Sequence, residues 1–516
     1  MTQLMSDNDE TSTSPVGTDA TGPAPAVAPA EGFGVRSARG SILLTLMQVA
    51  ASLIGFGTQI ALSWFLLPED FGTVAVAVSI SGLIAVIRDA GAPLILVQRQ
   101  HEFDRIAGSV FWMTLTGATL CGLLTAGAAP IVAHVKGNPV LLPVMLLTAL
   151  RFPIGALGTI SYTRLTVDLR WGMVAAVNLL VPVVMSGSAI LMAYLGAGVY
   201  ALLIPPMLAD MSRGFVSWLA TGKRFRLRPD MALISGIVVS SVWIVLSNLT
   251  LAARGFADFL TLSFTRDEHE TGLYFYAFVA AQSLSRLALG AGPSVLAPVF
   301  SKVKHDEARH ADILIKAIHM FAAMGVLTLT MQAAMTWPLF RLFLNPKWLG
   351  GAPIFCIITV MILACFLNLV IFQAVWANGL YKQFFTYSIV FTPVMVLLFL
   401  IGVKINGSMG VAWANLLAGV LDFIFYPIFA LPLLKVPWKR AIPPLWRPLV
   451  AAIPTALLAL FLHHALPVTK TADVLRILIT GTVGSIIYLL ILWFLWREIV
   501  RSAWSQVAGA LGVLRR

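Results

Sequence analysis

Long apolar runs alternate with short polar or Gly/Pro-rich breaks along most of this chain. The first run lies near 41–63 and the last near 475–496. A membrane-spanning helix needs about 20 apolar residues, and the pattern offers about fourteen such runs. They do not alternate apolar with polar residues as barrel strands do. The pattern predicts an all-α, polytopic membrane protein with about fourteen transmembrane helices.

Composition and charge agree with this prediction. Hydrophobic residues make up 59% of the 516 residues and charged residues only 11%. Basic residues concentrate in loops such as 223–228 and 435–440 and near 497–501, which the positive-inside rule assigns to the cytoplasm. We therefore expect an inner-membrane protein with both termini cytoplasmic. The net charge of +12 then reflects topology, and no nucleic-acid partner is expected.

An internal repeat predicts the domain organisation. Residues 70–93 and 270–293 share an acid followed by Gly, an arginine further along, and a small-residue/Pro break. Gly72 pairs with Gly272 at a constant offset, so we expect two pseudo-symmetric six-helix lobes around a central cavity, plus two extra helices. The expected divisions are a disordered cytoplasmic tail, the N-terminal lobe, the C-terminal lobe, helices 13 and 14, and a cytoplasmic tail that can form an amphipathic helix: 1–35, 36–228, 229–440, 441–496 and 497–516.

Four arginines fall inside these apolar runs: Arg88, Arg151, Arg213 and Arg286. A charge near the bilayer centre costs about 2.5–3.5 kcal/mol on insertion scales, unless it faces water, a partner or a ligand of opposite charge. Because a guanidinium binds phosphate oxygens in a bidentate manner, these residues are candidates for binding an anionic headgroup. A structural alternative exists for Arg151, because Pro153 can place it at a helix break.

Helical spacing suggests that some of these charges pair locally. Asp210 and Arg213 are three residues apart, and Arg254 and Asp258 are four apart, so each pair can neutralise itself. We expect Arg254 and Asp258 to form a structural pair. For Asp210 and Arg213, both the structural pairing and a role in the cavity stay open.

The remaining intramembrane polar residues are candidates for ion coupling. Asp89 follows Arg88 directly, and Asp422 has no acid or base within one helical turn. His319 could titrate, although a hydrogen-bonded interior histidine is the common case. Asp422, Asp89, Asp210 and His319 are therefore candidate coupling-ion or counter-charge sites. No metal site is expected, because the three cysteines lack a metal-ligand spacing.

Several segments in order along residues 36–435 resemble a known family. They read LPEDFGTVAVAVSISGLIAVIRDAGAPLILVQRQ (67–100), SNLTLAARGFADFL (247–260), PVFSKVKHDEARHAD (298–312) and NPKWLGGAP (345–353). In combination they are similar to the Wzx-type polysaccharide and lipid-linked oligosaccharide flippases of the multidrug/oligosaccharidyl-lipid/polysaccharide exporter superfamily. No single segment is diagnostic alone.

The resemblance implies a transporter without enzymatic activity. Such flippases move undecaprenyl-pyrophosphate-linked sugar repeat units to the outer leaflet by alternating access, for exopolysaccharide, capsule or O-antigen assembly. Membrane lipids, and the polymerase and chain-length or export proteins of the same pathway, would be partners. No cofactor is expected, with a coupling proton or sodium ion left open. A lipid II flippase or a multidrug extruder of the same superfamily is the alternative, and a membrane-embedded glycan polymerase is the least favoured.

Overall fold

In the computed structural model, the described residues are 31–89, 96, 102–222, 229–289, 296, 299–301, 303, 306–498 and 500–501. Helices dominate these residues, and no strand occurs among them, so the all-α prediction is confirmed. Eight helical ranges within them are long and apolar enough to cross a membrane. The protein is therefore a multi-pass membrane protein. The number fourteen stays a prediction, and the expected tails 1–35 and 497–516 lie almost wholly outside the described residues.

Helices follow the chain in three groups. The first group is α1 (Glu31–Phe65), α2 (Pro68–Ile84), α3 (Val86–Asp89), α5 (Phe103–Lys136), α6 (Leu141–Leu157), α7 (Thr159–Val167), α8 (Trp171–Tyr194) and α9 (Tyr200–Thr221). The second is α10 (Met231–Thr265), α11 (Glu268–Leu289), α13 (Glu307–Ala334), α14 (Thr336–Phe343), η2 (Pro346–Gly351), α15 (Ala352–Ala377) and α16 (Tyr381–Leu433). The third is α17 (Trp438–Ala441), η3 (Pro443–Leu445), α18 (Trp446–Ala465), α19 (Lys470–Ile479), η4 (Thr480–Gly484) and α20 (Ser485–Leu495).

Local chemistry explains where several helices begin and end. Gly137 and Gly222 follow α5 and α9 in the left-handed conformation that terminates helices. The Asp306 side chain accepts from the backbone N–H of Arg309 and caps the start of α13. The long α16 consists of two helices that meet at Gly407, where φ is +52°.

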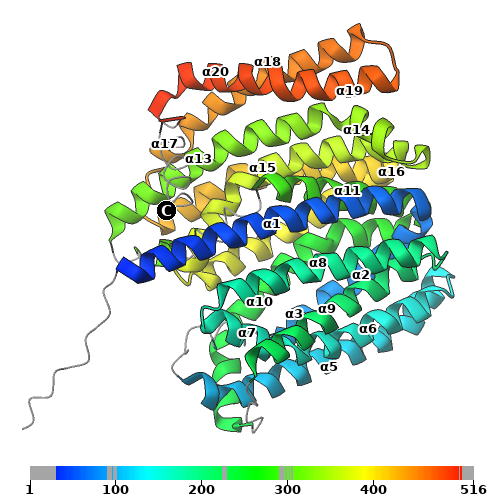
Figure 1. The fold of residues 1–516 in the computed structure, drawn as a ribbon, viewed down its shortest axis with the longest axis vertical. Helices are drawn as coiled ribbons and strands as arrows, with labels where there is room; N and C mark the ends of the chain where they lie inside the picture. Colours follow the sequence, from blue (N-terminus) through cyan, green and yellow to red (C-terminus); the bar gives the residue numbers. More distant parts are fainter. Residues whose placement is uncertain are drawn as a thin grey trace, which may run out of the picture.

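The third group lies at one edge of the bundle. Figure 1 shows α18, α19 and α20 beside α13 and α14, whereas α5 and α6 form the opposite edge. Between these edges, α2 packs along α11 and α1 packs between α8 and α11. The described side chains of α2 and α11 include no exposed large hydrophobic residue, unlike those of α5, α6 and α9. We infer that α2 and α11 are the two central helices, which the others shield from lipid.

The two central helices cross at the glycines of the repeat. A Cβ atom on Gly72 would lie 1.9 Å from the carbonyl oxygen of Glu268, and one on Gly272 would lie 1.7 Å from that of Pro68. Only glycine allows two backbones to approach this closely. The crossing lies where α1 and α10 end and α2 and α11 begin; we name this end of the bundle distal and the opposite end proximal.

Aromatic and polar contacts surround the glycine crossing. The ring of Phe71 meets those of Tyr276 and Trp348 edge-on at centroid distances of 5.3 and 5.2 Å. Trp348 Nε1 donates to the Ser63 carbonyl oxygen at 2.8 Å, although 285 residues separate them. His269 Nδ1 lies 2.7 Å from Glu69 Oε1, so two equivalent positions of the repeat contact each other. These contacts close the distal end between the two halves of the chain.

The crossing can be tested by adding one methyl group. Gly272→Ala should force α2 and α11 apart and lower the melting temperature of the purified protein by several degrees, because the new Cβ overlaps the Pro68 carbonyl. Gly255→Ala is the matched control: it lies in α10 with no atom within 4 Å of the added Cβ, and removal of a helical glycine should stabilise by about 0.5–1 kcal/mol. Equal melting temperatures for the two variants would contradict the close crossing.

Candidate functional site

A cluster of three charges joins α6 to α9 in the first group of helices, partway along both helices. Arg151 Nε donates to Asp210 Oδ2 at 2.9 Å, and one Nη atom of Arg213 donates to Asp210 Oδ1 at 3.1 Å. The Asp210 carboxylate thus lies between two guanidinium groups, and the cluster keeps one net positive charge. The predicted pairing of Asp210 with Arg213 is present, and Arg151 is a second partner that local spacing could not reveal. Both Arg151 and Asp210 lie ten residues, about 15 Å, from the distal start of their helices.

This cluster does not face lipid. The exposed large apolar residues of α6 and α9 each repeat at helical spacing on one side of their helix: Leu142, Leu146, Leu150 and Leu157 on α6, and Leu208, Met211, Phe215, Trp218 and Leu219 on α9. At about 100° per residue, Arg151, Asp210 and Arg213 point away from those sides. Nevertheless, the side chains of Arg151 and Arg213 are 47% and 36% exposed. Because these exposed guanidinium groups lie at membrane depth, they need water or an anion.

Neighbouring helices complete the surroundings of Arg213. Its guanidinium carbon lies 6.0 Å from the ring centre of Tyr162, and the Tyr162 hydroxyl donates to Asn178 Oδ1 at 2.8 Å. Tyr162 belongs to α7 and Asn178 to α8, so polar groups from four helices meet here. Such a group of hydrogen-bonding side chains is suited to a polar ligand such as a sugar or a phosphate.

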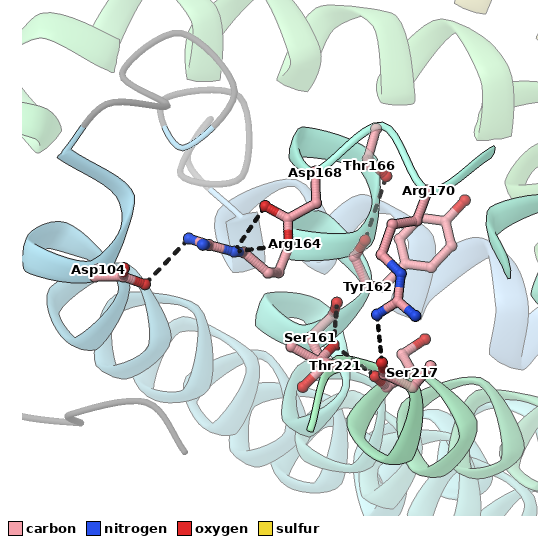
Figure 2. A network of polar contacts seen from close by, with 10 residues as sticks. Asp104, Ser161, Tyr162, Arg164, Thr166, Asp168, Arg170, Ser217 and Thr221 are labelled. Carbon is pink, nitrogen blue, oxygen red and sulfur yellow. Dashed lines mark hydrogen bonds and ion pairs between the residues drawn. The ribbon is translucent and has the colours of Figure 1, made fainter. Parts of the chain in front are cut away.

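A second polar network fixes the proximal ends of these helices (Figure 2). Arg164 of α7 binds Asp104 of α5 at 3.1 Å and Asp168 at 3.0 Å, and its guanidinium lies 4.8 Å from the Phe103 ring centre. Arg170 donates to the Ala220 carbonyl oxygen at 2.6 Å, near the end of α9. Arg164 and Asp168 are four residues apart, a spacing that could have revealed their pairing, whereas no local spacing pairs Arg164 with Asp104 of α5. Their role is to position α7 and α9, which carry Tyr162 and Arg213.

The expected pair of Arg254 and Asp258 is wrong. Arg254 instead donates to Asp422 Oδ1 at 2.6 Å, and its guanidinium lies over the Phe391 ring. Tyr387 also donates to Asp422 Oδ1, at 2.9 Å, and Asn368 donates to Oδ2 at 3.1 Å. Asp422 therefore has a counter-charge on another helix, 168 residues away in sequence, which spacing within one helix could not show. Asp422 thus accepts hydrogen bonds from one cation and from two neutral donors, which together compensate the cost of burying its charge.

Asp258 has a different environment. Its carboxylate accepts from the hydroxyl of Tyr274 at 2.8 Å, from Asn415 Nδ2 at 2.9 Å and from the backbone N–H of Phe259 at 2.8 Å. The residue is only 2% exposed. All of these partners are neutral, so the carboxylate is buried without a cation among the described residues that contact it.

The other candidate residues lie elsewhere. Arg286 is exposed on the central helix α11, and Arg88 is half-buried in α3. Asp89 ends α3, but its side chain lies outside the described residues. His319 is buried on α13, with Nε2 at 3.1 Å from the Ala441 carbonyl oxygen and its ring 4.7 Å from that of Trp496. His319 thus joins α13 to the third group of helices, and its proposed titration stays a prediction.

The described residues include no group of three or more histidine, cysteine or acidic side chains arranged to hold a metal ion. Among them, Cys121, Cys356 and Cys365 form no disulfide bond. The cluster of Arg151, Asp210 and Arg213 has a surplus positive charge and two partly exposed guanidinium groups. It is the candidate site for an anionic ligand, and Arg286 of α11, in the second group of helices, is a further candidate.

Comparison with known proteins assigns the family. Residues 61–353, more than half of the chain, match the family described as polysaccharide biosynthesis protein. The chain belongs to this family. The succinoglycan biosynthesis transport protein ExoT of Rhizobium meliloti (strain 1021) is 24% identical over 306 residues, which are 58% of this chain and 60% of that protein. The chain thus aligns with less than two thirds of the length of this curated relative. The resemblance to polysaccharide biosynthesis proteins is confirmed at the level of this family.

Solved structures confirm the fold. The structure described as lipid II flippase MurJ in an inward closed conformation covers 89% of this polysaccharide biosynthesis protein and all of the MurJ chain, with a TM-score of 0.70 at 14% identity. An inward-facing multidrug resistance transporter of the MATE family covers 77% of this chain and 99% of its own, with a TM-score of 0.55 at 16% identity. Identities this low establish a shared fold and no more.

The Arg254–Asp422 pair gives a test of the corrected assignment. Arg254→Gln should destabilise the protein by roughly 3–5 kcal/mol, because it leaves the Asp422 carboxylate buried without its cation. Adding Asp422→Asn should restore much of that loss, whereas adding Asp258→Asn should not. Unfolding of the single and double variants in detergent measures the two coupling energies. Coupling of Arg254 to Asp258 instead would refute the assignment.

Proposed function

We propose that this protein is a flippase that moves undecaprenyl-pyrophosphate-linked oligosaccharide repeat units from the cytoplasmic to the outer leaflet. The units would serve exopolysaccharide, capsule or O-antigen assembly. Family membership and the similarity to a succinoglycan transport protein support this proposal. The observation that carries it is the mid-bundle cluster of Arg151, Asp210 and Arg213, which turns away from the lipid-facing sides of its helices.

The chemistry of the cluster fits a lipid diphosphate. Moving such a headgroup through hydrocarbon would require desolvation of at least two negative charges. In the proposed mechanism, Arg151 and Arg213 bind phosphate oxygens while Asp210 holds the two guanidinium groups in position. Arg286 on the central helix α11 and Arg88 on α3, which follows α2, would add positive charge. The sugars would contact polar groups such as Tyr162 and Asn178.

Alternating access would follow from rocking of two lobes, 36–228 and 229–440, about the headgroup site. The glycine crossing supports this division, because it joins equivalent positions of the two repeats at the distal end. If both termini are cytoplasmic in the inner membrane, the closed distal end faces outward and the headgroup enters from the cytoplasmic side. A polymerase and chain-length or export proteins would act on the product, and a proton or sodium gradient would drive the step.

A lipid II flippase is the second candidate, because the fold matches the MurJ structure over nearly the whole chain. Both candidates handle a lipid diphosphate, so the arginine cluster does not separate them. Depletion of the protein from cells separates the two candidates. Cell-wall defects would support lipid II transport, whereas loss of polysaccharide in viable cells would support the main proposal. A multidrug extruder of the same fold is less favoured, because cationic substrates are poorly matched to interior arginines.

Loss of either guanidinium should impair transport. A hydrogen bond to a charged group contributes about 1.5–3 kcal/mol, so Arg151→Gln and Arg213→Gln should each weaken headgroup binding about tenfold or more. Polysaccharide yield and accumulation of the lipid-linked precursor in a deletion strain measure the effect. Arg309→Gln, an exposed arginine at the start of α13, is the matched control. Wild-type yield from both cluster variants, at normal protein abundance, would remove the cluster from the site.

A further inference from the structure

Asp258 is an unusual carboxylate for a membrane protein. It is buried on α10, about 10 Å from the distal end of that helix, which ends seven residues later. A buried carboxylate without a cation is costly, and proteins normally avoid the cost by pairing or by protonation. Arg254, one turn away on α10, is already bound to Asp422. The local cation therefore does not compensate Asp258.

We propose that Asp258 is a proton-binding site whose occupancy is transmitted to the contact between the two halves at the distal end. The proposal rests on the transport function proposed above, because it assigns the residue through which a proton could be coupled to that transport. Among the described ionisable groups on the helices packed against α10, Asp422 of α16 is paired with Arg254, and Glu270 of α11 lies 3.8 Å from Arg266. Tyr274 of α11 contacts the carboxylate directly. Glu270, one turn before Tyr274, accepts instead from the backbone N–H of Ser408 on α16.

Proton binding would rearrange the hydrogen bonds at this site. In the structure, Asn415 Nδ2 donates both to Asp258 Oδ2 at 2.9 Å and to the Tyr274 hydroxyl oxygen at 3.0 Å, while Tyr274 donates to the same Oδ2. A protonated carboxyl becomes a donor. The Tyr274 oxygen lies 2.8 Å from Oδ2. A proton on Oδ2 would be donated to that oxygen, and the Tyr274 hydroxyl would then give up its present bond and turn elsewhere. Uptake of one proton thus changes the hydrogen bonds that join α10, α11 and α16.

Helix α11 connects this linkage to the contact between the halves. Gly272, two residues before Tyr274, lies against the Pro68 carbonyl. Tyr276, two residues after, donates to the Gln59 carbonyl oxygen of α1 at 3.0 Å and lies against Trp348. One turn of α11 therefore holds both Tyr274, the hydrogen-bond partner of the proton site, and the crossing with α2. A displacement of Tyr274 would act on the distal closure directly.

Two measurements test the proposal on the full-length protein in lipid nanodiscs. The infrared carbonyl band of a protonated carboxyl should appear as pH falls, and should be lost in Asp258→Asn but kept in Asp312→Asn, an exposed carboxylate of α13. Spin labels at the exposed distal positions Leu67 and Ile405, in a background with the native cysteines replaced, should report a distance distribution that changes with pH. The Asp258→Asn variant should have one distribution at all pH values.

A second variant keeps the test decisive if Asp258→Asn does not fold. Tyr274→Phe removes a donor to the anionic form, so the carboxyl band should appear at a higher pH than in the wild type. Absence of a titrating band that depends on Asp258, or identical pH responses of wild type and Asp258→Asn, would overturn the proposal. Neither measurement requires substrate. A normal titration in a protein that fails to transport lipid-linked oligosaccharide would therefore reject the proposed function and leave the proton site intact.

Discussion

The cost of placing a charge at membrane depth determines where the polar side chains of this bundle lie. Arg254 and Asp422 neutralise each other across two helices, and two neutral donors complete the carboxylate. Arg151 and Arg213 share the single carboxylate of Asp210 and keep a surplus positive charge. The surplus is tolerable only where water or an anion can reach it, and both side chains are partly exposed on sides of their helices that the large exposed apolar residues do not occupy.

The same constraint explains why some helices expose large apolar side chains and others do not. Helices α6 and α9 cover their exposed side with large apolar residues, whereas α2 and α11 present no exposed large apolar residue among their described side chains. The central pair can be this close because glycine replaces a side chain on both helices at the crossing. Equivalent repeat positions also meet in the Glu69–His269 pair. A contact between repeat-related segments is what an approximate two-fold axis along the membrane normal produces.

Sequence reasoning succeeded where the determining interactions are local or repeated. Apolar run lengths predicted the helical class, and the constant offset predicted that Gly72 and Gly272 occupy equivalent places. Three-residue spacing offered the pairing of Asp210 with Arg213 as one of two alternatives. Sequence reasoning failed for Arg254, whose partner lies 168 residues away. Two acids were within reach of this arginine, and only the packing of α16 against α10 decides between them. The contact of Arg151 with Asp210 was hidden for the same reason.

A partly neutralised cluster suits a transport site better than free arginines would. A carrier must bind its ligand firmly enough to load and weakly enough to release, as holds for ions in a channel. Two bare guanidinium groups facing a diphosphate in a low-dielectric site would hold it strongly, since charge–charge energies rise several-fold as the effective dielectric constant falls. In the proposed mechanism, Asp210 accepts from Nε of Arg151 and from one Nη atom of Arg213, so the remaining N–H groups of both guanidinium groups stay available to the headgroup. The negative charge of Asp210 would lower the attraction of the cluster for an anion, and both arginines keep a partner while the site is empty.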